Sequence, residues 1–373
     1  MPRRARQAPR RPPIASACHR PRRRPHTRTQ SEFVRIFRAR PGDYLPSWGG
    51  ATGAAGRLIT AAKRHADFAA VVDVGCNTGS WSQSWLGKDA GGGRKKTGML
   101  LCIEALPSLA QSMRKRWDNG GADSDLVHVI NVALSNTSGV MQLYGLPASA
   151  GKFARGQTGA GLSRAPSEAS HVPLGSVQVQ TLDDVLRQWR LLDGGRLFVK
   201  VDTEGFDVHV LGGAACALRR GAIDVLQIEW NRRKLASAAP ACVSLRRVAW
   251  LLEQYDYEAF LVGRPFIPIN FGFWDDAYEA RALPCPPRCT GDVVALRRGL
   301  AAREAIRREL LADAHGKLLA DAHGMKPDAR SIRATSSRSA GARGRGAIGS
   351  ARALGSSASA TRTRLARGSK GTG

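Results

Sequence analysis

A predicted strand, glycine-containing turn and helix over residues 68–82 constrains the fold of this chain more than any other stretch. Val71 to Val74 form a short apolar run rich in β-branched residues, which is typical of a buried strand. Gly75 and Gly79 follow this run and permit a sharp turn before a helix. Such a turn presents unpaired backbone N–H groups and the positive end of a helix to a ligand. We therefore expect a ligand site at this turn.

A second apolar run, Met99 to Ile103, ends at Glu104. An acidic residue at the tip of the strand next to a glycine turn can bind both ribose hydroxyls of an adenosine ligand. The turn lacks the three-glycine spacing of a dinucleotide site, since Asn77 stands where the middle glycine would be. Asn does tolerate a positive φ better than most residues. An ordinary strand-to-helix turn without a ligand is the alternative interpretation.

Predicted strands alternate with predicted helices along the middle of the chain. The strands are expected at residues 71–74, 99–103, 126–134, 140–144, 177–180, 196–202, 223–229, 258–262 and 292–296. The helices are expected at residues 58–65, 80–86, 106–117, 182–189, 208–220 and 245–254. This alternation predicts an α/β fold with a mainly parallel sheet.

Positive charge is concentrated at the two ends of the chain. The net charge is +27, yet residues 1–31 hold ten arginines and residues 329–373 hold nine arginines and one lysine, with no acidic residue in either. Subtracting these twenty charges leaves +7 for residues 32–328. Both ends have too few apolar residues to pack, so we expect them to be disordered. The folded part is then only mildly basic.

Three interpretations of the arginine-rich residues 1–31 remain open: a solvated tail, an organelle transit peptide, and a segment for nucleic-acid contact or nuclear import. The transit-peptide interpretation places the protein in an organelle, and otherwise we expect an intracellular, cytoplasmic location. No apolar stretch approaches the roughly 20 residues needed to span a bilayer. The seven cysteines are scattered, which favours reduced thiols. No metal site is expected.

The domain boundaries follow from composition. Residues 32–300 are expected to form the folded domain, and residues 301–328 a helical extension that contains two copies of an octapeptide, residues 310–317 and 318–325. A slip duplication explains two such copies better than a repeat fold does. Residues 145–176 are rich in Gly, Ala and Ser, and a loop of this length is typical of a lid, a binding loop or disorder.

Acidic side chains gather where two predicted strands end. Lys200, Asp202 and Glu204 lie at the end of one strand, and Glu229 ends the next. Open α/β sheets bind ligands at this edge, so one carboxylate there can take a proton from an acceptor hydroxyl while another orients it. The alternative is a structural ion-pair network around Lys200. Asp202, Glu204 and Glu229 are the candidate catalytic residues, with His209 next.

Several of these segments together resemble the FkbM-type methyltransferases that use S-adenosylmethionine (SAM), in the same order and spacing. They are Asp73-Val-Gly-Cys-Asn-Thr-Gly79, Asn131-Val-Ala-Leu-Ser-Asn136, Thr181-Leu-Asp-Asp-Val-Leu186, Lys200-Val-Asp-Thr-Glu-Gly205, Val210-Leu-Gly-Gly-Ala214 and Ile228-Glu229. The resemblance covers about residues 68–262 and is most specific in the block that begins at Lys200. The long 145–176 loop and the basic ends depart from the usual pattern.

The resemblance implies a Rossmann-like class I methyltransferase with a mainly parallel seven-stranded sheet flanked by helices. It also implies SAM as methyl donor and O-methylation of a small molecule or glycan. The residues expected to bind SAM are Asp73, Gly75, Asn77, Gly79, Glu104 and Asn131. The alternative is a nucleic-acid-associated basic protein that uses the same fold, with or without catalysis. The basic residues lie in tails with almost no aromatic side chains, which disfavours nucleic-acid binding.

Overall fold

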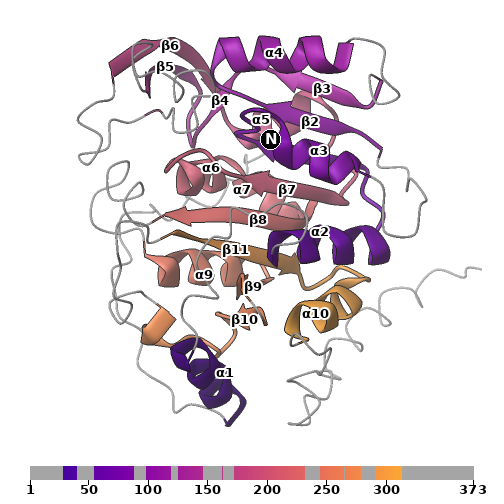
Figure 1. Cartoon of the computed structure of the whole chain (residues 1–373), viewed down its shortest axis with the longest axis vertical. Helices are drawn as coiled ribbons and strands as arrows, with labels where there is room; N and C mark the ends of the chain where they lie inside the picture. The colour runs from indigo at the N-terminus through magenta and orange to yellow at the C-terminus, as the bar shows by residue number, and fades with distance from the viewer. Residues whose placement is uncertain are drawn as a thin grey trace, which may run out of the picture. The chain divides into compact units, whose positions relative to one another are not determined.

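A mixed sheet of eight strands runs through the centre of the protein (Figure 1). The computed structural model describes residues 28–39, 54–87, 98–118, 125–145, 162, 172–231, 244–263, 265–278 and 290–312. The strand order is β10-β9-β11-β8-β7-β1-β2-β3. The strands are β1 (Ala70–Val74), β2 (Leu100–Ile103), β3 (Val127–Ile130), β7 (Leu197–Val201), β8 (Ile223–Asn231), β9 (Tyr257–Leu261), β10 (Ile267–Pro268) and β11 (Thr290–Arg297).

The sheet has a parallel half and an antiparallel half. β3, β2, β1, β7 and β8 are parallel to one another, whereas β11 runs antiparallel to β8 and β9, and β10 runs antiparallel to β9. Every residue of β1 and β7 is buried, as expected for central strands with helices on both faces. The expected α/β sheet is confirmed, but it has eight strands rather than seven because the two-residue β10 adds an edge strand.

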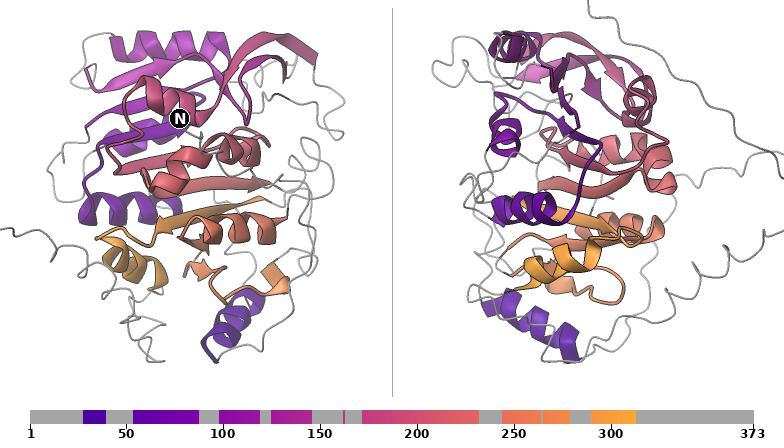
Figure 2. Two further views of the ribbon diagram at one scale, coloured as in Figure 1. Left: turned by 180° about the vertical axis from the view of Figure 1, so that it is seen from behind. Right: turned by 90° about the vertical axis from the view of Figure 1, so that its right-hand side faces the viewer.

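Helices cover both faces of this sheet (Figure 2). One face carries α2 (Ala54–His65), α3 (Ser80–Leu86), α4 (Pro107–Asp118) and α10 (Arg303–Leu311). The other carries α5 (Leu182–Gln188), α6 (Asp207–Gly213), α7 (Ala215–Arg220) and α9 (Leu245–Gln254). The side chains of Thr181 and Ser244 cap the starts of α5 and α9, and Gly221 ends α7 in the left-handed conformation.

A second, three-stranded sheet lies beside the main one, with the order β4-β6-β5. Its strands are β4 (Ala133–Leu134), β5 (Gly139–Gly145) and β6 (Val172–Gln180). The sequence predicted one strand over residues 126–134, but the chain leaves β3 at Asn131 and enters the small sheet at Ala133. Its apolar side chains, among them Leu143, form a separate small core together with Leu162 and Phe206 from outside the sheet. This small core borders the ligand site described below.

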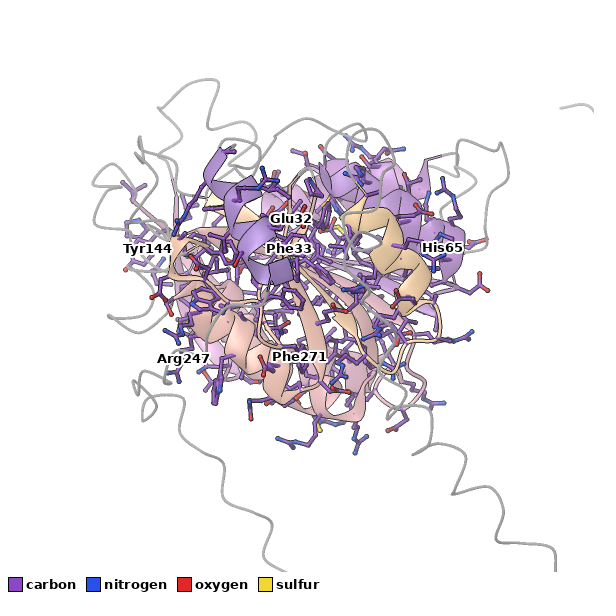
Figure 3. The ribbon with its side chains drawn as sticks, turned by 90° about the horizontal axis from the view of Figure 1, so that it is seen from below. Glu32, Phe33, His65, Tyr144, Arg247 and Phe271 are labelled. Carbon is purple, nitrogen blue, oxygen red and sulfur yellow. A yellow bond between two sulfur atoms is a disulfide. The ribbon has the colours of Figure 1, made fainter. Side chains whose placement is uncertain are left out.

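Helix α1 (Arg28–Ala39) packs against the β10 end of the main sheet, with Phe33 and Phe37 buried (Figure 3). It begins four residues before the expected start of the folded domain. At the other end of the chain, Glu309 of α10 bonds His65 of α2. Residues 1–27 and 313–373 lie outside the described residues, so the expected disorder of the ends and most of the octapeptide repeat stay predictions. None of the helices within the described ranges has the length and apolar character needed to cross a bilayer.

Candidate functional site

The turn after β1 has the conformation that its glycines predict. Gly75, Asn77 and Gly79 all have positive φ, at 74°, 52° and 77°. A Cβ atom on Gly75 would lie 1.9 Å from the backbone oxygen of Asp202 on the neighbouring β7 end. Only glycine fits there, because the turn passes directly over the end of β7. The turn therefore fixes the distance between the β1 and β7 ends of the site.

Glu104 joins this turn to the end of β2. Its Oε2 accepts a hydrogen bond from the backbone N–H of Asn77, and its Oε1 accepts one from Leu106, both at 2.8 Å. The side chain of Asn131 donates to the backbone oxygens of Glu104 and Ala105, which holds the same β2 end from the β3 side. Burial raises the pKa of Glu104, and the two backbone hydrogen bonds oppose that rise. A carboxylate that still has free lone pairs is thus fixed at the pocket.

A disulfide between Cys76 and Cys102 also joins the turn to β2. The backbone N–H groups of Gly75 and Cys76 both donate to Ile103, which places Cys76 directly over the neighbouring strand. Met113 of α4 contacts both sulfurs, at 3.7 and 3.3 Å. The expectation that all thiols are reduced is wrong for this pair. The spacing of the two cysteines gave no sign of a bond, because they meet only through the pairing of β1 with β2.

Lys200 of β7 lies between two carboxylates on the α3 face of the sheet. Its Nζ is 3.1 Å from Asp73 Oδ1 on β1 and 3.3 Å from Asp202 Oδ2. Asp73 is fully buried and also accepts a hydrogen bond from Ser82 of α3, at 2.7 Å. Lys200 was expected to pair with Asp202 or Glu229; it pairs with Asp202, and Asp73 is a second partner. Asp73 is therefore a buried partner that holds Lys200 in place, and it does not line the pocket itself.

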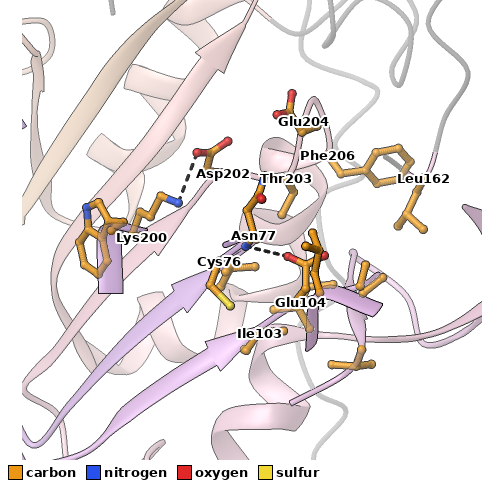
Figure 4. Close-up of a pocket in the computed structure, with 18 of the residues that line it drawn as sticks. Cys76, Asn77, Ile103, Glu104, Leu162, Lys200, Asp202, Thr203, Glu204 and Phe206 are labelled. Atoms are coloured by element: carbon orange, nitrogen blue, oxygen red, sulfur yellow. Dashed lines mark hydrogen bonds and ion pairs between the residues drawn. The ribbon is translucent and has the colours of Figure 1, made fainter. Parts of the chain in front are cut away.

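These residues surround a cavity of about 360 Å³ at the carboxyl ends of β1, β2 and β7 (Figure 4). One wall consists of the glycine turn with Asn77, and Glu104 lies next to it. Asp202 and Glu204 lie at the end of β7, on the other side of Asn77 from Glu104. The volume is in the range of pockets that hold one small-molecule ligand. The site lies where open α/β sheets bind ligands.

The predicted site residues divide into two groups. Gly75, Asn77, Glu104, Asp202 and Glu204 line the cavity. The other four, Asp73, Gly79, Asn131 and Glu229, are not among its lining residues. Gly79 directly precedes α3 and has the left-handed conformation. A Cβ atom there would lie 2.9 Å from the Trp117 ring, so this position needs glycine for close packing against Trp117.

Apolar lining residues were missed at the sequence level. Leu143 and Leu162 come from the small sheet and from the segment between its strands, and Phe206 follows the Lys200 block. Figure 4 shows Leu162 and Phe206 next to each other above Glu104. Trp81 of α3 lines the same cavity near Lys200, whose Nζ is 6.0 Å from the Trp81 ring centroid. The only available signal was the long 145–176 loop, which was recognised as a candidate lid or binding loop.

The chain is similar to several solved methyltransferase structures. A methyltransferase FkbM from Methylobacillus flagellatus KT aligns at 14% identity and TM-score 0.35, covering 61% of this chain and 42% of that one. An O-methyltransferase from Bacillus cereus, in complex with SAH, aligns at 12% identity and TM-score 0.32, covering 74% and 92%. A putative O-methyltransferase from Klebsiella pneumoniae aligns at 15% identity and TM-score 0.30, covering 73% and 91%. This chain therefore spans less than half of the Methylobacillus protein.

No curated protein matches the sequence. The methyltransferase FkbM domain does match it, over residues 73–259. That match begins at Asp73 in β1 and ends in β9, so it includes the glycine turn, Glu104, the small sheet and the Lys200 block. It covers half of the chain. This protein belongs to the FkbM methyltransferase family.

Proposed function

We propose that this protein transfers a methyl group from SAM to a hydroxyl group of a small molecule or sugar. The observation that carries the proposal is the arrangement of one cavity. It has a glycine turn and Glu104 on one side, and Asp202 and Glu204 on the other. The first side suits a nucleoside with a charged tail, and the second supplies carboxylates for an acceptor. Membership of a methyltransferase family supports the reaction type.

The residues of the cavity fit SAM. Glu104 is positioned to accept hydrogen bonds from the ribose hydroxyls, since each of its oxygens uses only one lone pair for the backbone. Gly75 has no side chain, so the turn can lie against the end of β7 and form a wall of the cavity. Apolar side chains such as Leu109 and Val132 also line the cavity and suit the adenine ring. Bound SAM supplies an activated methyl group on its sulfonium.

The protein's task in this reaction is to align the acceptor, exclude water and remove one proton. The methyl group moves in line from sulfur to the acceptor oxygen, and the hydroxyl proton leaves that oxygen. Asp202 and Glu204 are the candidates to take the proton or to orient the hydroxyl while water takes it. Lys200 holds Asp202 by an ion pair at 3.3 Å. Among the described residues, no group of three His, Cys, Asp or Glu side chains has the arrangement of a metal site.

Calorimetry on the full chain tests the donor. SAM and its demethylated product SAH should each bind with one site per chain, and Glu104→Ala should weaken both. Nonspecific duplex DNA tests the alternative of a nucleic-acid-associated protein. DNA binding that weakens steeply with salt, with no detectable SAM binding, would contradict our proposal.

For the acceptor, the protein is incubated with SAM carrying a labelled methyl group and with small-molecule and sugar fractions. Labelled products that form only with the intact site support methyl transfer.

A further inference from the structure

A row of polar side chains crosses four neighbouring strands on the α3 face of the sheet. Asp73 of β1 pairs in register with Lys200 of β7, and Lys200 pairs with Gln227 of β8. Two residues further along, Asp202 follows β7 and Glu229 belongs to β8, so both point to the same face as Lys200 and Gln227. Asp292 of β11 pairs directly with Glu229. Four carboxyl groups and one lysine therefore share this row.

The row contains more acid than its lysine can neutralise. Lys200 lies 3.1 Å from Asp73 and 3.3 Å from Asp202, and both distances are those of ion pairs. Within the described part of the chain, neither Glu229 nor Asp292 forms an ion pair. Asp292 accepts a hydrogen bond from the Gln227 side-chain amide at 3.3 Å. Charges without partners are costly away from water, so the remaining acids must lower their charge by holding protons.

Within this row, Glu229 is the carboxyl group with the strongest reason to remain protonated. Its neighbour across the two strands is Asp202, because Val201 of β7 pairs with Ile228 of β8 and the next residues along these strands are Asp202 and Glu229. Its Oε2 is buried without a hydrogen-bond partner among the described residues. Two ionised carboxylates are both acceptors, so these two side chains can bond each other only when one of them is protonated. Asp202, in contrast, has a cation beside it, because its Oδ2 lies 3.3 Å from Lys200 Nζ. We propose that Glu229 retains its proton at neutral pH and donates it to Asp202, so that the two carboxyls act as one singly charged pair at the edge of the cavity.

The electrostatics of the surrounding groups agree with this assignment. Burial raises the pKa of Glu229 to about 10, with further increases from Asp202, Asp207 and Asp292. Burial and Asp202 also raise the pKa of Asp292 to about 7 and that of Asp207 to about 6. Asp207 is otherwise satisfied, because it accepts hydrogen bonds from the backbone N–H groups of Thr203 and Gly205. Among these acids, Glu229 is thus the one still protonated well above neutral pH.

The consequence for catalysis rests on the proposed function. A Glu229 that already holds a proton cannot take another from the acceptor, so it is not the base. It is instead a positioning residue that turns Asp202 toward the cavity and keeps the charge of the pair at minus one. Asp202 then remains the only member of the pair that can accept the hydroxyl proton. This removes Glu229 from the three catalytic candidates that the sequence suggested.

Replacement of Glu229 by glutamine tests the proton without any substrate. Glutamine is neutral and keeps an N–H donor, so Glu229→Gln imitates the protonated acid. Glu258→Gln is the matched control, since Glu258 is a buried acid of the same sheet that has a cation partner, Arg307, at 2.8 Å. We expect Glu229→Gln to melt at or above the wild-type temperature at pH 7, and Glu258→Gln to melt clearly below it. Similar losses in both variants would overturn the proposal.

The pH dependence gives a second readout. An acid whose folded pKa is raised contributes stability that is complete below its unfolded pKa and is lost as the pH rises through the folded pKa. With the pKa of Glu229 at about 10, the advantage of Glu229→Gln over the wild type should grow between about pH 5 and pH 10. Asp207 and Asp292 titrate in both proteins, so the difference between the two curves isolates Glu229. A constant difference across this range would contradict the proposal.

Infrared spectroscopy detects the proton directly, even if a variant fails to fold. At pH 9 the wild-type protein should show the carbonyl band of a protonated carboxylic acid, since Asp207 and Asp292 are ionised by then. The band should be absent in Glu229→Gln and present in Glu258→Gln. A wild-type spectrum without the band at pH 9 overturns the proposal whatever the variants do. None of these measurements uses SAM or an acceptor, so failure of the proposed function would leave their outcome unchanged.

Discussion

The two sides of the cavity are held in place by different kinds of interaction. On the donor side, the turn after β1 and the end of β2 are held by backbone hydrogen bonds to Glu104 and by a disulfide. On the acid side, Asp202 at the end of β7 is held by an ion pair with Lys200, which also pairs with Asp73 of β1. The donor side is thus specified by backbone geometry and the acid side by charge balance. The first should be sensitive to steric changes, and the second to changes of charge and pH.

The largest effect is expected from a side chain at Gly75. Gly75→Val places a Cβ 1.9 Å from the backbone oxygen of Asp202, and it forces a non-glycine residue to a φ of 74°. The left-handed conformation alone costs about 1–2 kcal/mol, and the collision must also push the two strand ends apart. SAM binding should be undetectable by calorimetry. Gly194→Ala is the control, since a Cβ there meets nothing within 4 Å. Normal SAM affinity in Gly75→Val would contradict a donor side built on close backbone approach.

The next effect concerns turnover rather than binding. Asp202→Asn removes the candidate base and weakens the ion pair with Lys200, while the donor side stays intact. Loss of a general base costs about 10²–10⁴ in rate, and kcat should fall far more than SAM affinity. Glu204→Gln is measured in parallel, because Glu204 is the other candidate. Melting temperature on the same samples separates loss of catalysis from loss of folded protein. Unchanged turnover in both well-folded variants would rule out a base on this side.

A smaller effect is expected at Glu104. Glu104→Ala should weaken SAM binding by about 1.5–3 kcal/mol, the range for hydrogen bonds to a charged group. The variant also leaves the N–H groups of Asn77 and Leu106 without their acceptor, so part of the loss comes from a less ordered turn. Glu104→Gln separates the two contributions, because its amide oxygen can still accept one of these bonds. Equal affinity in all three proteins, measured by calorimetry, would remove the donor assignment.

The smallest effect is expected from the ends of the chain. Residues 1–27 and 329–373 are rich in arginine and have few apolar side chains that could pack on the folded part. Removal of both segments should therefore change the free energy of unfolding by no more than about 0.5 kcal/mol, as for surface changes away from packed features. SAM affinity should also be unchanged. The N-terminal deletion must stop before α1, since Phe33 and Phe37 are buried. A large drop in melting temperature would show that an end of the chain packs on the folded part.

The sequence predicted the donor side more fully than the acid side, and the reason is physical. Gly75, Asn77 and Glu104 are marked by local rules, because a positive φ and the tip of an apolar run depend on a few adjacent residues. The proximity of Lys200 and Asp202 also followed from alternation along one strand. The overall α/β fold came from the same local periodicities. Helix α1 and the edge strand β10 were missed, and β10 has only two residues, which are too few to show a pattern.

What the sequence did not predict depends on which strands are neighbours. Asp292 lies 63 positions beyond Glu229 in the chain, and only the antiparallel pairing of β11 with β8 brings them together. Cys76 and Cys102 likewise meet because β1 pairs with β2. Leu162 reaches the cavity from a segment with no periodic pattern. Such contacts are set by tertiary packing, and a single sequence contains no local signal for them.

The disulfide closes residues 76–102 into a covalent ring that contains the whole of α3. A backbone cut anywhere between residues 77 and 101 would open this ring without separating the protein into two molecules. The fragment that contains Cys76 and the fragment that contains Cys102 would stay linked at the sulfurs, beside Glu104. On a gel, such a nicked chain should run as one species until a thiol reductant is added and as two afterwards. On the donor side of the cavity, the backbone can therefore be cut while the two fragments stay covalently attached.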